Sequence, residues 1–249
     1  MRRSTPLLFV GLLSCWFCAV IPSSGYSAPA ATGAAASPLP DGTKTHQYTI
    51  SFFGKLSGRM IVNVLPNGRI TTDFSYRDNG RGPDIFEEIS VDANGQFESF
   101  NASGKSTFGA PIAERFSRVN GKATWQSKAD TGEVANVPTA IYVPIESSFE
   151  ASSVVVRALL GAPGNKLAAL PNGQLSIEQV LDAAVVRGKV SAVVTLYQVS
   201  GLSFEPNYIW MWKTATPAKA RLFGIVSPGF AAIESGWVVG QADRANLLV

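Results

Sequence analysis

The sequence holds few residues that could perform hydrolytic or metal-dependent chemistry. His46 is the single histidine among 249 residues, whereas a catalytic zinc site usually takes two or three histidine ligands. The motifs H-x-H and H-E-x-x-H are therefore absent, and no serine lies within a G-x-S-x-G nucleophile motif. We expect His46 to be a surface histidine at the start of a strand, and we assign no catalytic residue and no metal site.

Phosphate- and nucleotide-binding loops are also missing from the sequence. Gly104-Lys105-Ser106 resembles the end of a phosphate-binding loop, but Ser99 stands where that motif requires its first glycine. The segment also follows a predicted strand and precedes no predicted helix. The dinucleotide motif G-x-G-x-x-G does not occur, so we expect no cofactor.

Paired carboxylates are the remaining candidates for acid–base chemistry. Glu87 and Glu88 are adjacent, so their side chains would point to opposite faces of a strand and could not flank one bond. Glu146 and Glu150 form a second candidate pair. Because glutamate is usually exposed, a solvated strand face explains Glu87 and Glu88 better than a carboxylate-based hydrolase does.

Three aromatic side chains are the most conspicuous candidates for contact with a ligand or a partner. Tyr208, Trp210 and Trp212 alternate along one strand-length segment, so they should share a face. Such a face could stack on sugars or cover a lipid tail. Packing in the core, or burial against another domain, is the more common role of such side chains.

Composition indicates a folded, exported protein. Charged residues make up 16% of the chain and hydrophobic residues 46%, which excludes general disorder. The formal charge of +3 argues against a nucleic-acid partner. Residues 1–30 resemble a cleaved signal peptide, with Arg2 and Arg3, an apolar run, and Ala28-Pro29-Ala30 as a cleavage site.

Export would deliver the domain to the periplasm or the outside of the cell, with no membrane contact except through the signal. Lipidation at Cys15 is a minor alternative. Cleavage would remove both cysteines and two of the 21 basic residues, against 18 acidic ones, and so leave a nearly neutral domain. Small residues and prolines up to Pro40 predict a flexible linker over 31–44, followed by one domain over 45–249.

Regular turn signals predict a mainly β (α+β) fold. Asn-Gly and related pairs recur between strand-length runs and supply the positive φ that tight hairpins need. Alternating residues, such as Tyr48, Ile50 and Phe52, indicate an antiparallel sheet with one face on a core. We therefore expect a curved antiparallel sheet built of hairpins.

Two short helices are expected beside this sheet. One covers about residues 148–160 and ends at Gly161. The other covers 176–187, where Ser176-Ile177-Glu178-Gln179 has the pattern of a capping box and apolar residues follow at helical spacing.

Three segments in the second half carry a resemblance to a known family. They are Leu170-Pro171-Asn172-Gly173-Gln174-Leu175, Leu196-Tyr197-Gln198-Val199-Ser200-Gly201-Leu202 and Pro206-Asn207-Tyr208-Ile209-Trp210. Together they resemble the leading region of exported bacterial amidohydrolases of the imidazolonepropionase-like kind. In that family a β-rich N-terminal region precedes a metal-dependent hydrolase barrel. The family's metal-binding histidines and aspartate belong to the barrel, and no position of this sequence matches them.

The resemblance implies a non-catalytic accessory domain that packs against a hydrolase barrel in the same chain or from an adjacent gene. The apolar end Asn246-Leu247-Leu248-Val249 would then belong to a chain that stops early. A second hypothesis is a free-standing exported binding module, in which the sheet holds an apolar or lipid-like ligand against the two helices. This hypothesis predicts a cavity lined by Tyr208, Trp210 and Trp212.

Overall fold

The computed structural model describes residues 38–135 and 139–239. The expected signal peptide over 1–30, the alternative lipid site at Cys15 and the apolar end over 246–249 lie outside these residues. Regular structure in the described chain begins with β1 (Lys44–Phe52). Within the described residues, no helix has the length and apolar character needed to span a membrane.

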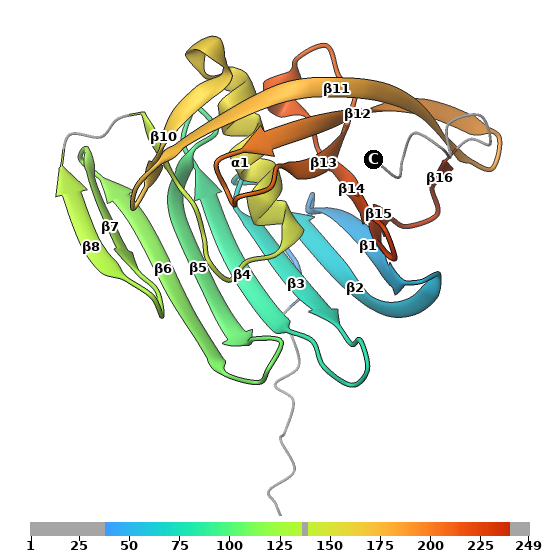
Figure 1. The fold of residues 1–249 in the computed structure, drawn as a ribbon, viewed down its shortest axis with the longest axis horizontal. Coiled ribbons are helices and arrows are strands. Elements are labelled where there is room, and N and C mark those ends of the chain that lie inside the picture. The colour runs from blue at the N-terminus through green and yellow to red at the C-terminus, as the bar shows by residue number, and fades with distance from the viewer. Residues whose placement is uncertain (1–37, 136–138, 240–249) are drawn as a thin grey trace, which may run out of the picture. The chain divides into compact units, whose positions relative to one another are not determined.

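The first half of the domain is an antiparallel meander in which each strand pairs with the next along the chain (Figure 1). Alternation decides which face is buried: Tyr48 and Ile50 of β1 lie in the core, and Phe52 packs at its margin. The strands that follow β1 are β2 (Lys55–Val64), β3 (Ile70–Tyr76), β4 (Asp84–Val91), β5 (Phe97–Lys105), β6 (Pro111–Val119), β7 (Lys122–Gln126) and β8 (Thr131–Ala135).

The second half continues the same sheet, because β15 pairs with β1. The described strands form one 16-stranded sheet that runs from β8 to β9 and is antiparallel except where β9 pairs with β10. These strands are β9 (Ala140–Tyr142), β10 (Lys166–Leu170), β11 (Gln174–Arg187), β12 (Val190–Ser200), β13 (Asn207–Trp212), β14 (Leu222–Ser227), β15 (Phe230–Glu234) and β16 (Val238–Val239). The expected mainly β, antiparallel fold is confirmed.

Helix α1 (Phe149–Gly161) confirms the helix predicted over 148–160. Ser148 is its N-cap, and the Ser148 side chain accepts a hydrogen bond from the backbone N–H of Glu150. The helix is buried on nearly all sides, because the main core joins it to strands of both halves of the sheet. Figure 1 shows α1 between β3–β6 on one side and β10–β13 on the other.

The helix predicted over 176–187 is wrong, because this segment is strand β11. A β-bulge between Gln179 and Leu181 in the pairing with β12 explains the misleading pattern. Because of the inserted residue, odd-numbered residues of β11 lie on one face of the sheet before the bulge and on the other face after it. Ile177 packs in the main core, whereas Ala183 and Val185 pack on the opposite face. The reversed alternation resembles helical spacing in the sequence.

The short one-turn helices η1 (Pro163–Asn165) and η2 (Pro217–Lys219) complete the described elements. Each begins with a proline, which suits the first position of a helical turn. Helix α1 packs against η2, β11 and β14. Toward the first half, Phe149 contacts Phe74 of β3, and the N-cap Ser148 donates to Glu87 of β4, so the helix packs between the two halves.

Leu159→Ala should lower the free energy of unfolding by about 2–5 kcal/mol, because Leu159 is fully buried and its truncation leaves a cavity in the core. Leu160→Ala is the matched control, since Leu160 is the next residue of the same helix and is only partly buried. Urea unfolding of both variants measures the difference. Equal losses would contradict the central position of α1.

Candidate functional site

The three aromatic residues predicted to contact a ligand or partner lie on β13 and face away from α1. Trp210 is 1% exposed, while Tyr208 and Trp212 are half-buried in the same outer cluster. Ile209 and Met211, which alternate with them, belong to the main core around α1. Tyr208, Trp210 and Trp212 therefore share one face, as their alternation requires.

Residues of the same chain pack over this outer cluster. The ring of Trp237 lies 4.7 Å from that of Trp212, and the guanidinium of Arg187 lies 4.7 Å from the Trp237 ring centre. Trp212 Nε1 donates a hydrogen bond of 2.6 Å to Glu234, and Arg221 lies over the Trp212 ring. Five pockets of about 300–570 Å³ among the described residues are lined by other side chains. We assign the outer cluster a packing role.

His46 joins this network and is only partly exposed. Its Nδ1 lies 3.0 Å from Arg221 Nη1, which also donates to Glu234 at 2.9 Å. Burial raises the pKa of Glu234, but interactions with His46, Trp212 and Arg221 outweigh burial and hold that pKa below its ordinary value. Within the described residues, no group of three or more histidine, cysteine, aspartate and glutamate side chains could hold a metal ion.

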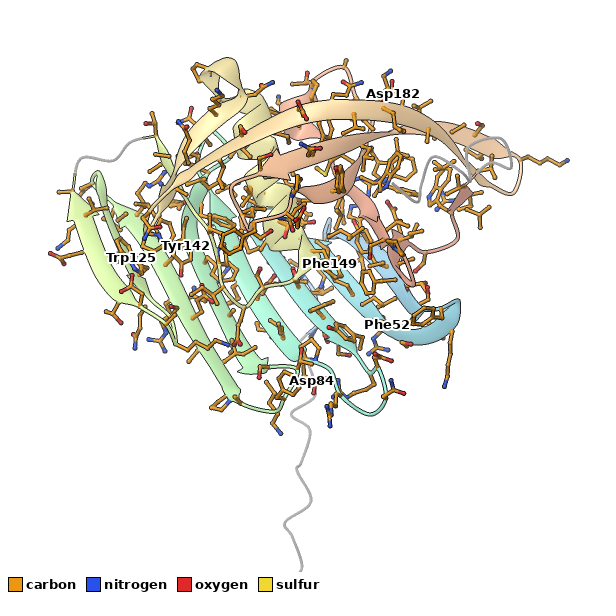
Figure 2. The ribbon with its side chains drawn as sticks, in the orientation of Figure 1. Phe52, Asp84, Trp125, Tyr142, Phe149 and Asp182 are labelled. Carbon is orange, nitrogen blue, oxygen red and sulfur yellow. The ribbon has the colours of Figure 1, made fainter. Side chains whose placement is uncertain are left out.

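A pocket of about 300 Å³ lies at the end of the sheet where α1 begins; we call it the mouth pocket. Figure 2 shows Phe149 at this end of α1, Asp84 at the start of β4 and Phe52 at the end of β1. The apolar lining comes from three strands, the segment before α1 and the first residue of α1. The main lining residues are Phe74, Tyr76, Ile85, Ile112, Ile145 and Phe149.

The floor of the mouth pocket is one row of register partners across four strands. Phe74 of β3 lies opposite Ile85 of β4, which lies opposite Gly104 of β5, which lies opposite Ile112 of β6. A Cβ at Gly104 would lie 2.0 Å from the carbonyl oxygen of Asp84, and Gly104 has a φ of +131°. No side chain fits there, so the row keeps a gap between Ile85 and Ile112.

An aromatic cycle closes the side of the mouth pocket that faces β1 and β15. Each of its five side chains contacts the next, with ring centres 5.1–5.7 Å apart and tilted or edge-on geometry. Such geometry is the favoured one for aromatic pairs. The cycle runs through Phe52, Tyr76, Phe74, Phe149 and Phe230, and all but Phe74 are partly exposed.

The segment that forms the other wall is held by two buried carboxylates, which we call the carboxylate staple. Glu114 of β6 accepts hydrogen bonds from the backbone N–H groups of Ile145 (2.9 Å) and Glu146 (3.0 Å). Glu87 of β4 accepts from the backbone N–H of Ser148 and, at 2.5 Å, from its hydroxyl. The staple therefore satisfies three backbone N–H groups just before α1.

The staple lies in the row directly behind the pocket floor. Thr72 is opposite Glu87, Glu87 is opposite Ala102, and Ala102 is opposite Glu114. The small side chain of Ala102 separates the two glutamates. Tyr142 of β9 also donates a 2.6 Å hydrogen bond to Glu114. Both carboxylates therefore accept hydrogen bonds from the chain itself.

The solvated position expected for Glu87 from the sequence is wrong, whereas Glu88 lies on the outer face and pairs with Arg69. Burial raises the pKa of Glu87 to about 7, against the hydrogen bonds from Ser148, which act in the opposite direction. The sequence did contain a signal for burial. Glu87 lies two residues from both Ile85 and Ile89, so all three side chains share one face of β4, and both isoleucines face the core.

Comparison with known proteins gives no functional guide. No protein-family profile matches the chain, and no curated protein is significantly similar to it. A β-barrel-like protein of the domain of unknown function DUF1849 from Brucella abortus is 11% identical, with a TM-score of 0.45 over 79% of this chain and 97% of that chain. A DUF1089 family protein from Pseudomonas aeruginosa is 12% identical, with a TM-score of 0.40 over 68% and 89%. These similarities are too low to carry an argument.

Glu87→Gln should change how stability depends on pH. The folded-state pKa of about 7 exceeds the ordinary value of 4.5, so Glu87 favours the folded state at low pH and loses that contribution as pH rises from about 4.5 to about 7. As the pH rises from about 4.5 to about 7, the free energy of unfolding of the wild-type chain should therefore fall by about 3 kcal/mol relative to that of Glu87→Gln. Urea unfolding at several pH values measures this loss, with Glu88→Gln as the exposed control. A constant difference between Glu87→Gln and wild type would contradict it.

Glu114→Gln should loosen the segment before α1, because a neutral amide oxygen is a weaker acceptor than a carboxylate and replaces only one of its two oxygens. Hydrogen exchange at the amides of Ile145 and Glu146 should become at least tenfold faster. Exchange at Phe100 of the neighbouring strand β5, and at Phe97 of the same strand, serves as the internal control. Unchanged protection at Ile145 and Glu146 would show that Glu114 does not hold the segment.

Proposed function

We propose that the domain is a binding module for an apolar or lipid-like ligand, which it holds in the mouth pocket. The observation that carries the proposal is the aromatic cycle, of which Phe74 and the partly exposed Tyr76 and Phe149 line a pocket of about 300 Å³. That volume is at the lower end of the range for small-molecule pockets, and apolar and aromatic linings are typical of them.

The exposure of apolar side chains around the pocket supports the same proposal. Ile145 is 49% exposed and Phe108, on the loop between β5 and β6, is 83% exposed. Clustered apolar side chains in contact with water are costly, and they commonly mark a ligand or interaction site. A ligand in the mouth pocket would cover Ile145, which lines it, whereas Phe108 lines an adjoining pocket.

This proposal moves the ligand from the site expected on the sequence. The sequence predicted a ligand beside Tyr208, Trp210 and Trp212, whereas the ligand proposed from the geometry lies beside Phe149 in the mouth pocket. The proposed delivery of the module to the periplasm or cell exterior rests on the sequence pattern of residues 1–30 alone.

A role as the accessory domain of an exported amidohydrolase is a second proposal, and it rests on the resemblance of residues 170–175, 196–202 and 206–210. It requires a metal-dependent barrel with an H-x-H motif, encoded in the same reading frame or in an adjacent gene. The nucleotide sequence beyond the codon for Val249 tests this directly. A stop codon without a neighbouring hydrolase gene would exclude it.

The neutral fluorescent probe N-phenyl-1-naphthylamine should bind the domain, and Ile145→Trp should weaken binding about tenfold, or about 1.4 kcal/mol. Ile145 lines the pocket and is half exposed, so a larger side chain narrows the pocket without disturbing the core. Val119→Trp is the control, because Val119 is exposed at the end of β6 and away from the pocket. Equal effects of the two substitutions would place the probe elsewhere.

A further inference from the structure

A second pocket of about 470 Å³ adjoins the mouth pocket and differs from it in charge; we call it the rim pocket. Tyr76 and Thr107 line both pockets, so the two are neighbours at the same end of the sheet. The mouth pocket has mainly apolar walls. The rim pocket adds two charged side chains, Asp78 and Arg81, to the aromatic walls formed by Phe52, Tyr76 and Phe108.

The backbone fixes Asp78 and Arg81 side by side. They form an antiparallel bridge with hydrogen bonds of 2.7 and 2.9 Å, closed by Asn79 and Gly80, whose φ angles are +49° and +78°. Positive φ at both central residues defines the tight hairpin turn that keeps strands in register. Bridge partners project from the same face of a hairpin, so both charges lie on one side of this turn.

Neither charged side chain has a side-chain partner in residues 38–135 and 139–239. Within the described residues, no ion pair involves Asp78 or Arg81, although the adjacent Arg77 pairs with Asp84 at 2.6 Å. A carboxylate and a guanidinium therefore face the rim pocket, close to three aromatic side chains. A carboxylate beside aromatic faces attracts an ammonium group, and a guanidinium is suited to a phosphate.

We propose that the rim pocket binds the zwitterionic head group of a single-chain amphiphile whose apolar chain occupies the mouth pocket. The ammonium contacts Asp78 and the faces of Phe52, Tyr76 and Phe108, and the phosphate contacts Arg81. This inference rests on the proposed function, since it names the ligand class of the same site. Charge complementarity selects the occupant: a purely anionic head would leave Asp78 opposed to it, and a purely cationic head would leave Arg81 opposed to it.

Four amphiphiles with the same decyl chain test the head group, by calorimetry below their micelle concentrations. They are decylphosphocholine, decyl phosphate, decyltrimethylammonium and decyl maltoside. Decylphosphocholine should bind at least tenfold more tightly than decyl maltoside, and the two amphiphiles whose head groups carry charge of one sign only should fall between them. Free phosphocholine should bind at least tenfold more weakly than decylphosphocholine, because it lacks the chain.

Two charge variants separate the two halves of the head group. Arg81→Gln should weaken decylphosphocholine and decyl phosphate about tenfold and leave decyltrimethylammonium unweakened. Asp78→Asn should weaken decylphosphocholine and decyltrimethylammonium and leave decyl phosphate unweakened. Arg59→Gln and Asp73→Asn are the matched controls, because they make the same charge changes at exposed positions on the outer face of β2 and β3.

Equal affinity for all four amphiphiles would overturn the head-group inference, and so would the same loss of affinity in the control variants. If N-phenyl-1-naphthylamine still bound the mouth pocket, the proposed function would stand. Free phosphocholine binding as tightly as decylphosphocholine would overturn the two-pocket arrangement. Failure of the neutral probe to bind would reject the proposed function itself.

Discussion

The wall of the mouth pocket depends on how the backbone before α1 satisfies its hydrogen bonds. This segment crosses the inner face of a sheet, where water cannot serve every N–H group, and an unpaired buried N–H is costly. Two glutamates supply the acceptors, and each projects inward between two apolar residues of its strand, Glu87 between Ile85 and Ile89 and Glu114 between Ile112 and Phe116. The carboxylate staple therefore fixes both the path of the segment and the starting point of the helix.

The buried charge of the staple has a cost that the neighbouring elements reduce. Glu87 lies at the N-cap of α1, where the positive end of the helix dipole favours a negative charge. Its hydrogen bonds from Ser148 act in the same direction, yet burial still raises its pKa to about 7. Removing the Glu87 carboxylate would leave the backbone N–H of Ser148 without its acceptor, so the segment before α1 depends on a group that burial disfavours.

Much of the fold followed from local sequence signals, because hairpins and short helices are locally encoded. The meander from β1 to β7 and helix α1 needed only turn residues, alternation and a glycine stop, whereas the short strand β8 was not predicted. β11 was misread because its bulge shifts the alternation by one residue, and a bulge is specified by pairing with β12 rather than by β11 alone. The packing role of Trp212 also depends on distant partners, among them Trp237 and Glu234.

The candidate site was less accessible to sequence reasoning, because register across several strands creates it. The role of Gly104 depends on its neighbours Ile85 and Ile112 on the two adjacent strands, between which it leaves a gap. The role of Glu87 depends on a segment about 60 residues later in the chain, which it binds. The same register also limits what the site can hold. The polar row of Glu87 and Glu114 follows directly behind the apolar floor, about 7 Å along the strands. A ligand's apolar part must therefore end before that row, since it would otherwise displace hydrogen bonds on which the pocket wall depends.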